Sequence, residues 1–337
     1  MGQPQILTRG ARITGSVAAA LIALISAGWI VRDLTETEKP NLLWWRWVGV
    51  PLDGGGFILY SCLLDLGLFL VCAAVAVTAV RSPSAASGLV AAGLLALIAR
   101  APSVWILLDK ERFGILDLRV RLLASAIATV GLGLILLLLA AFGRRPVVES
   151  AGYSYTFDDE EQPPRPTNGA AATAFIFLGA VAAVAGAWQV HNAMDLGWRR
   201  YRELITGESL LSSALAPPTG WLVWSLALLA LVAAIAALNR ATFSRALGMT
   251  AAAVFLLYGA GGVTWAVKAD RFSGLMDAEL LVQLEVLTQL FYVLAGAVCL
   301  LVLFRGRERR DEREYGDWDP AGGVYGPPPP STLPPGW

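Results

Sequence analysis

The sequence has little of what most catalytic and metal-binding sites are made from. It contains one histidine, His191, and three cysteines. A single histidine excludes histidine-rich metal sites, HExxH proteases and haem sites held by a histidine pair. Cys62, Cys72 and Cys299 have no paired spacing and predict neither a disulfide framework nor a zinc motif. We interpret them as small apolar residues of a core.

Catalytic and nucleotide-binding motifs are missing as well. The chain has no Walker loop, no GxGxxG element after a strand and no GxSxG elbow. Its net charge is zero, which gives no electrostatic reason to expect a nucleic acid or an acidic substrate. We therefore predict no cofactor, no metal site, no catalytic residue and no nucleic-acid partner. Catalysis by aspartates alone stays open as an alternative.

Lysine is scarce among the basic residues. Of the 26 Lys and Arg residues, only Lys39, Lys110 and Lys268 are lysines. Together with abundant Ala, Gly and Leu, this bias is typical of a GC-rich genome, so we expect a bacterial protein.

Apolar residues are abundant and lie in long runs. They make up 56% of the chain, and the mean hydropathy is +0.60. Each run has the roughly twenty residues that a helix needs to cross about 30 Å of hydrocarbon. The pattern predicts an all-α polytopic membrane protein with eight transmembrane helices, at 13–31, 57–80, 88–108, 121–143, 170–190, 221–238, 246–268 and 282–304.

The pattern of membrane-spanning segments and loop residues occurs twice in the chain. Trp29 ends the first run and Trp188 ends the fifth. A tryptophan, an acid-Arg-Phe triplet and an aspartate then recur in the outer loops: Trp105, Glu111, Arg112, Phe113 and Asp117 in the first half, and Trp265, Asp270, Arg271, Phe272 and Asp277 in the second. We predict two tandem parallel four-helix repeats, at residues 1–145 and 169–306, related by an axis along the membrane normal.

The repeated outer-loop motif has a structural interpretation. Asp117 and Asp277 are suited to capping the helix that follows them. Trp105 and Trp265 fit an outer aromatic belt, while Phe113 and Phe272 are suited to covering helix ends. We favour this hairpin-stabilising role over ligand binding, which remains the alternative.

The arginines next to the helix ends predict the orientation. Arginines flank the spans on one side, whereas on the other side they are interleaved with acids. By the positive-inside rule we predict a multi-pass plasma-membrane protein with both termini in the cytoplasm. The outer connections are then 32–56, 109–120, 191–220 and 269–281.

Each four-helix unit is followed by an acidic, proline-containing cytoplasmic segment, at 146–168 and 307–337. Such composition cannot bury enough apolar surface to fold alone, so we expect disorder. The last residues, including Pro327 to Pro330, favour polyproline II and could dock in the aromatic groove of a cytoplasmic protein. A solvated tail without a partner is the alternative.

Asp65 and Arg100 form the sharpest local signal. Each lies eight residues inside the outer end of its predicted span, at a depth of roughly 12 Å. Arg100 continues a stripe of small residues at four-residue spacing, Gly88, Ala92 and Ala96, which is typical of a face against another helix. We predict that the two pair within the bilayer. A structural ion pair is favoured, and a gate or substrate-binding element stays open.

Three classes of function remain. A non-enzymatic protein that binds or organises partners fits the missing motifs and the proline-rich tail. A small-solute or lipid transporter fits the duplicated bundle with Asp65 and Arg100. A membrane enzyme acting on a lipid-linked substrate fits only the size and the outer-loop acids. We expect polar groups around a cavity for a transporter, carboxylates in a cleft for an enzyme, and a sealed bundle for an organising protein.

Overall fold

The computed structural model describes residues 5–37, 39–50, 59–82, 85–109, 118–146, 165–208 and 213–306. The chain divides into two units, Met1–Arg307 and Glu308–Trp337, and every described residue lies in the first unit. The predicted tail at 307–337 and most of the predicted linker at 146–168 lie outside the described residues.

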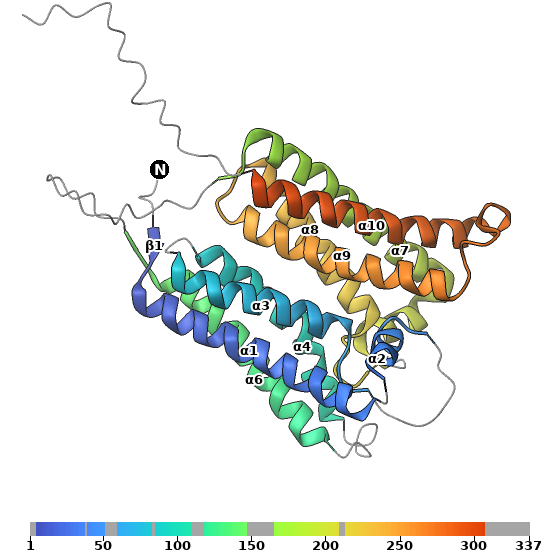
Figure 1. Cartoon of the computed structure of the whole chain (residues 1–337), viewed down its shortest axis with the longest axis horizontal. Helices are drawn as coiled ribbons and strands as arrows, with labels where there is room; N and C mark the ends of the chain where they lie inside the picture. The colour runs from blue at the N-terminus through green and yellow to red at the C-terminus, as the bar shows by residue number, and fades with distance from the viewer. Residues whose placement is uncertain are drawn as a thin grey trace, which may run out of the picture. The chain divides into compact units, whose positions relative to one another are not determined.

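Eight helices in the described residues are long and apolar enough to cross a membrane, as predicted. The molecule is therefore an all-α polytopic membrane protein. Figure 1 shows these helices side by side: α1 (Arg9–Glu36), α3 (Leu63–Arg81), α4 (Ala86–Leu108), α6 (Arg119–Phe142), α7 (Asn168–Thr206), α8 (Thr219–Leu238), α9 (Ser244–Lys268) and α10 (Leu280–Arg305).

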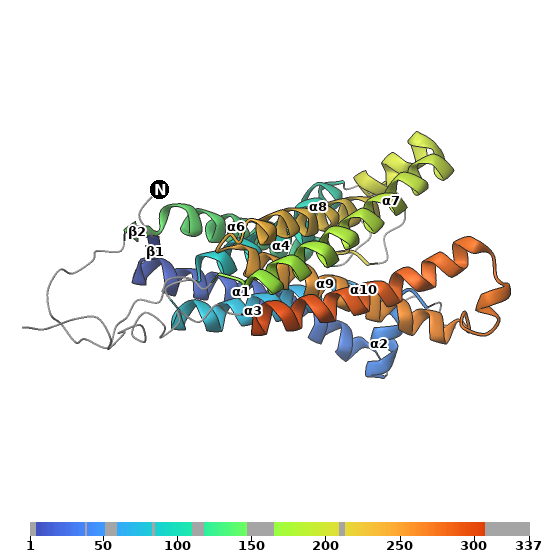
Figure 2. The same cartoon turned by 90° about the horizontal axis from the view of Figure 1, so that it is seen from above.

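The helices pack in consecutive pairs. Helix α1 lies along α3 and α4 along α6, while α7 lies along α8 and α9 along α10 (Figures 1 and 2). Helix α9 also packs on α3 and α4, and α8 packs on α4. The central helices α3, α4, α8 and α9 have 44–61% of their apolar window buried, against 28–33% for α1, α6, α7 and α10. The outer four therefore present most of the apolar surface available to lipid.

Small residues let the paired helices approach closely. A Cβ atom added to Gly133 on α6 would lie 3.2 Å from the carbonyl oxygen of Gly93 on α4. A Cβ atom on Gly296 of α10 would lie 2.7 Å from the carbonyl oxygen of Ala252 on α9. Without a hydrophobic force between helices in lipid, this close backbone packing is what holds such pairs together.

The first helix of each half is anchored to the last helix of that half by the same contacts. Thr8 caps α1 by accepting a hydrogen bond from the Ala11 N–H, and its own N–H donates to the Gly143 carbonyl at 2.9 Å. Thr167 caps α7 by accepting from the Ala170 N–H, and its N–H donates to the Gly306 carbonyl at 3.1 Å. Thr167 thus ends the described part of the predicted linker in an ordered cap.

The opposite ends of these helices are also tied in matching ways. The Trp29 indole on α1 donates to Ser125 Oγ on α6 at 3.0 Å. The Trp188 indole on α7 donates to Thr288 Oγ1 on α10 at 3.0 Å. An indole N–H buried near the membrane boundary needs such an acceptor, which the hydroxyl on the facing helix supplies.

The predicted outer connections contain further helices. Helix α2 (Pro40–Trp47) lies within 32–56, and α7 continues to Thr206 across a kink at Gly197. Gly197 has φ 72° and ψ 157°, a conformation that a side chain would not tolerate. The 3-10 helix η1 (Leu275–Asp277) lies within 269–281.

The second span begins later than predicted. Helix α3 begins at Leu63, and the described residues before it, 59–62, are not helical. Hydropathy marks residues 57–80 as one apolar run but cannot tell a buried extended segment from a helix, because burial alone sets the signal. The extended piece is central to the site described below.

A two-stranded sheet closes the end of the molecule that carries the start of α1. Strand β1 (Gln5–Leu7) pairs with β2 (Arg144–Pro146) in antiparallel fashion, with Ile6 opposite Arg145. This pairing extends the Thr8–Gly143 contact by three residues and places the end of α6 beside the start of α1.

Candidate buried polar site

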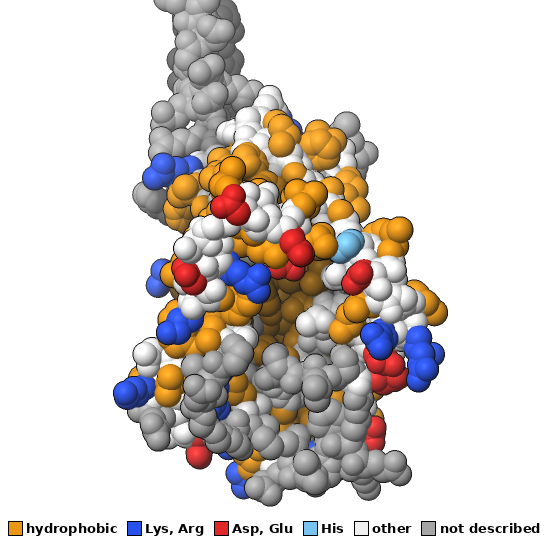
Figure 3. All heavy atoms as spheres, turned by 90° about the vertical axis from the view of Figure 1, so that its right-hand side faces the viewer, with side chains coloured by type: hydrophobic (Ala, Val, Ile, Leu, Met, Phe, Trp, Pro, Cys, Tyr) orange, Lys and Arg blue, Asp and Glu red, His pale blue; other side chains and the backbone are white. Residues whose placement is uncertain are grey.

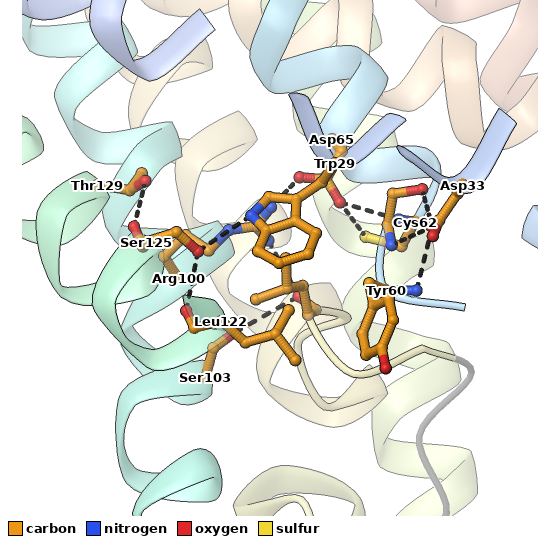
Figure 4. Close-up of polar contacts among 12 residues, drawn as sticks. Trp29, Asp33, Tyr60, Cys62, Asp65, Arg100, Ser103, Leu122, Ser125 and Thr129 are labelled. Carbon is orange, nitrogen blue, oxygen red and sulfur yellow. Dashed lines mark hydrogen bonds and ion pairs between the residues drawn. The ribbon is translucent and has the colours of Figure 1, made fainter. Parts of the chain in front are cut away.

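The predicted partners Asp65 and Arg100 are brought together by the structure. Arg100 Nη2 on α4 donates to Asp65 Oδ1 on α3, and both side chains are buried (Figure 4). Among the fully buried side chains, Arg100 is one of the largest. A guanidinium and a carboxylate at this depth compensate each other's desolvation only if their remaining polar atoms also find partners.

The start of α3 supplies those partners for Asp65. Cys62 is the N-cap residue, and its N–H donates to Asp65 Oδ2 at 2.9 Å, while its Sγ lies 3.4 Å from the same oxygen. Asp65 is the third residue of the helix and closes a capping box. Its carboxylate therefore faces both Arg100 and the positive end of the α3 dipole.

Arg100 joins the first half of the chain to the second. Its Nη1 donates to the carbonyl oxygen of Leu215 at 3.0 Å, in the segment that precedes α8. Ser103, one turn further along α4, has its Oγ 3.5 Å from the same carbonyl oxygen. The arginine thus holds an ion-pair partner from α3 and a backbone acceptor from the other half.

The segment 59–62 continues this connection through its backbone. The N–H groups of Ala214 and Leu215 donate to the carbonyls of Leu59 and Tyr60, each at 3.1 Å. Non-helical backbone at membrane depth is tolerated where protein buries it and satisfies its polar groups. These two bonds meet that condition and place the two stretches side by side.

A second buried carboxylate, Asp33, completes the cluster, and sequence reasoning missed it. Its Oδ2 accepts from the N–H groups of Tyr60 and Ser61 at 3.1 and 2.6 Å, and from Ser61 Oγ at 2.6 Å. Its Oδ1 pairs with Arg32 Nη1 at 2.9 Å. Asp33 is fully buried, whereas Arg32 is partly exposed and lies 4.2 Å from the centre of the Tyr60 ring.

Aromatic side chains enclose the cluster. The Trp47 indole of α2 donates to Ser61 Oγ at 3.2 Å. The Trp29 ring stands beside the Tyr60 ring, with centroids 5.8 Å apart (Figure 4). Tyr60 and Ser61 thus each have an aromatic neighbour, and the cluster is packed from the side of α1 and α2.

Only part of the repeated outer-loop motif lies within the described residues. Glu111, Arg112, Phe113 and Asp117 lie outside the described residues. Trp105 donates from its indole to the Thr206 carbonyl at 3.0 Å and packs edge-on against Trp221, whereas Trp265 lies under the guanidinium of Arg271 at 5.3 Å. The two tryptophans therefore make different contacts.

The second copy of the motif does not cap the following helix. Glu279 is the N-cap residue of α10 and makes no side-chain capping bond, while Asp277 ends η1 two residues earlier. The extended residue Ala278 separates the two, so the Asp277 side chain is not in the capping position. Gln283 ties the turn instead, by donating to the carbonyls of Met276 and Ala278. Asp270 has a positive φ of 53°, and Phe272 is exposed.

The charged side chains of this site are paired with one another, which limits the chemistry that the site can perform. Asp33 and Asp65 each face an arginine, so the cluster carries no net charge. In the described ranges, only Ser213 Oγ and Ser244 Oγ are buried polar side-chain atoms without a hydrogen bond. No three His, Cys, Asp or Glu side chains in the described part of the chain are grouped to hold a metal. The three cysteines are free and buried.

The end of the molecule that carries the α9–α10 connection, the end of α7 and α2 is hollowed. Figure 3 looks onto this end and shows a recess whose visible walls are hydrophobic, with acidic and basic side chains around it. Exposed apolar side chains at this end include Trp198 and Met276.

No protein-family model, curated protein or solved structure matches this chain.

Proposed function

We propose that this chain is a non-enzymatic integral membrane protein that binds or organises partner proteins, with its helix bundle as a rigid platform. The observation that carries the proposal is the internal pairing of the buried polar site. Asp65 is held by Arg100 and the α3 N-terminus, and Asp33 by Arg32 and three donors at residues 60 and 61.

A site of this kind favours a sealed bundle over a pathway. A carrier needs polar groups that exchange protein partners for a solute, and the groups of this cluster are occupied by one another. An arginine that bridges α3, α4 and the segment before α8 fixes the relation of the two halves. Stable relative placement of helices is what a platform for partners requires.

We further propose that the platform consists of two parallel four-helix repeats, at residues 1–145 and 169–306. Support comes from the matched Thr8–Gly143 and Thr167–Gly306 contacts and from the matched indole-to-hydroxyl bonds of Trp29 and Trp188. Under the positive-inside rule both termini lie in the cytoplasm of a bacterial cell. The proline-rich end of the chain is then available to a cytoplasmic protein.

Removal of residues 312–337 tests the partner-binding role. Proteins crosslinked to the full chain in membranes should be lost from the truncated chain, while membrane insertion and thermal stability stay unchanged. Replacing Pro327 to Pro330 with alanine is a second test variant. It keeps the charge of the tail but removes the polyproline II geometry, so it should lose the same crosslinked proteins. An unchanged set of crosslinked proteins in both variants contradicts docking at the tail.

Transport is the second candidate, and the start of α3 favours it. A helix that begins inside the membrane with its N-terminus at a charged group is a feature of substrate and ion sites in transporters. Helix α3 begins at Leu63 beside Asp65 and Arg100. Substitutions that leave stability unchanged but abolish uptake of a solute in vesicles would support transport over the organising role.

A further inference from the structure

A cavity of about 350 Å³ lies where α1 begins and α3 ends, far from the buried polar site. Three arginines line it, Arg9, Arg12 and Arg145, together with apolar side chains that include Ile6, Ile13 and Val80. Among the described residues that line it, none is acidic. The cavity thus combines positive charge with an apolar wall at one end of the helix bundle.

Each arginine is positioned by a defined part of the fold. Arg12 donates to the carbonyls of Ala79 and Val80, which are the last turn of α3. Arg145 is brought to the cavity by β2, where it stands opposite Ile6 in the strand register. Arg9 is the first residue of α1 and is exposed. All three arginines line the cavity although they come from two distant parts of the sequence.

The threonine cap at the start of α1 does not require Arg9 or Arg12. The same threonine cap and glycine contact begin α7, where the residues one and four positions after Thr167 are Asn168 and Ala171. The residues one and four positions after Thr8 are Arg9 and Arg12. Since the cap forms equally well without charge, the cap does not explain Arg9 and Arg12, although Arg12 also ties α1 to the last turn of α3.

Exposed apolar side chains continue from the cavity into the membrane region, and we call the surface formed by Ile13, Val17, Val77 and Val80 the apolar lane. Helix α1 runs away from the cavity and α3 runs toward it, so residues beyond Ile13 and before Val80 lie deeper. Ile13 and Val17 are one turn apart on α1 and are 49% and 54% exposed, and Val77 and Val80 on α3 are each 53% exposed. The lane is therefore open to a ligand with an acyl chain.

We propose that this cavity binds an anionic phospholipid, with the phosphate group among the three arginines and an acyl chain along Ile13, Val17, Val77 and Val80. Basic pockets between transmembrane helices are suited to such headgroups, and guanidinium groups bind phosphate through paired hydrogen bonds. Under the proposed orientation the lipid belongs to the cytoplasmic leaflet. The role is independent of the tail and of the buried polar site.

Lipid competition on the full-length protein tests the site. Delipidated protein is offered equal amounts of phosphatidylglycerol and phosphatidylcholine in detergent, and retained lipids are counted by native mass spectrometry. The wild type should retain phosphatidylglycerol preferentially. The double variant Arg9→Gln/Arg145→Gln should lose roughly 30-fold in affinity for it, since each arginine contributes roughly a five- to sixfold factor.

A matched control removes two arginines from the same end of the bundle but outside the cavity. Arg165→Gln/Arg305→Gln affects two exposed residues next to the Thr167–Gly306 contact, and it should leave retention unchanged. Equal losses in both double variants, or equal retention of the two lipids by the wild type, overturn the proposal. Binding of glycerol phosphate as tight as that of phosphatidylglycerol also overturns it, because the apolar lane would then contribute nothing.

A second variant keeps the test decisive if the arginine substitutions impair folding. Ile13→Trp keeps every charge, changes a half-exposed position and fills the apolar side of the cavity. It should reduce phosphatidylglycerol retention at least tenfold while thermal stability in phosphatidylcholine micelles is unchanged. Full retention by this variant contradicts binding in the cavity.

Discussion

At the scale of single residues, the buried carboxylates are tolerated because each accepts hydrogen bonds from several donors. Asp33 Oδ2 accepts three hydrogen bonds, and Asp65 has a backbone N–H and an arginine. Loss of one partner leaves a charge without compensation in a low-dielectric interior, whereas loss of both removes the problem together with the attraction. The pairs should therefore behave as units under mutation.

A double-mutant cycle on Asp65 and Arg100 measures this coupling. Asp65→Asn and Arg100→Gln should each lower the free energy of unfolding in detergent by about 3–5 kcal/mol. The double variant should cost less than the sum of the two, because neither side chain is then left charged alone. Thermal or denaturant unfolding followed by circular dichroism provides the measurement.

The exposed pair Arg202 and Glu208 is an internal control for that cycle. Its charged atoms lie 3.9 Å apart and its side chains are 59% and 52% exposed, so Glu208→Gln should change stability by less than about 1 kcal/mol. Additive losses at Asp65 and Arg100 would show that the two residues do not interact in solution.

At the scale of elements, glycines at the helix ends set how the first and last helices of each half meet. A Cβ atom on Gly143 would lie 2.6 Å from Ala11 Cβ, and one on Gly306 would lie 2.5 Å from Ala170 Cβ. The two contacts use the same residue types at the same place relative to a threonine cap. They should respond to substitution in the same way.

Gly143→Ala and Gly306→Ala should each destabilise the protein by about 1–3 kcal/mol, because the added methyl group overpacks the contact with α1 or α7. Thermal unfolding of each variant in the same detergent is the measurement. Unequal effects, with one variant near wild type, would argue against equivalent roles for the two ends.

Gly10 and Gly169 are the matched controls. Both lie in the first turn after a threonine cap, and an added Cβ atom would have no neighbour within 4 Å. Alanine at either position should leave stability unchanged or raise it by up to about 1 kcal/mol, since alanine favours the helix. A loss at these positions would mean that helix ends in general, and not the glycine contacts, are sensitive.

These elements could be predicted from the sequence to different degrees. The eight spans follow from apolar runs because the bilayer fixes both their length and their composition. The start of α3 did not follow, because residues 57–62 are as apolar as the helix after them. The kink at Gly197 and the turn at Asp277 depend on backbone angles, and polar outer segments carry no periodic signal for those.

At the scale of the whole molecule, four central helices are covered by four peripheral ones, and the ends of the bundle differ in chemistry. The arginine-lined cavity lies at one end. The aromatic contacts of Trp105 and Trp221 lie at the other, near the start of α8. Such asymmetry is what fixed topology in the membrane requires, and it can be tested directly.

Substituted-cysteine labelling should report the orientation with little background, because Cys62, Cys72 and Cys299 are buried. Met276→Cys, at a position that is 87% exposed, should react with a membrane-impermeant maleimide in intact cells. Arg165→Cys should react only after the membrane is permeabilised. The reverse pattern would place both termini outside and contradict the proposed topology.

The site was only half accessible to prediction from the sequence. Asp65 and Arg100 stand out because a charge within an apolar run is rare. The small-residue stripe also indicates that Arg100 lies on a face against another helix. Asp33 follows Arg32 at the end of a run and is indistinguishable there from a solvated surface pair. Its partners Tyr60 and Ser61 can be found only once the backbone at 59–62 is known to be extended.

The pairing of Leu59 and Tyr60 with Ala214 and Leu215 has a consequence for biogenesis. Arg100 is separated from its acceptor Leu215 by 115 residues, which a ribosome needs roughly 6–23 seconds to synthesise. During that interval the carbonyls of Leu59 and Tyr60 and the Nη1 group of Arg100 have no partner from the later half. Until the chain has passed residue 215, these groups of the nascent first half lack their partners from the second half. During that time they need shielding by the insertion machinery or by water.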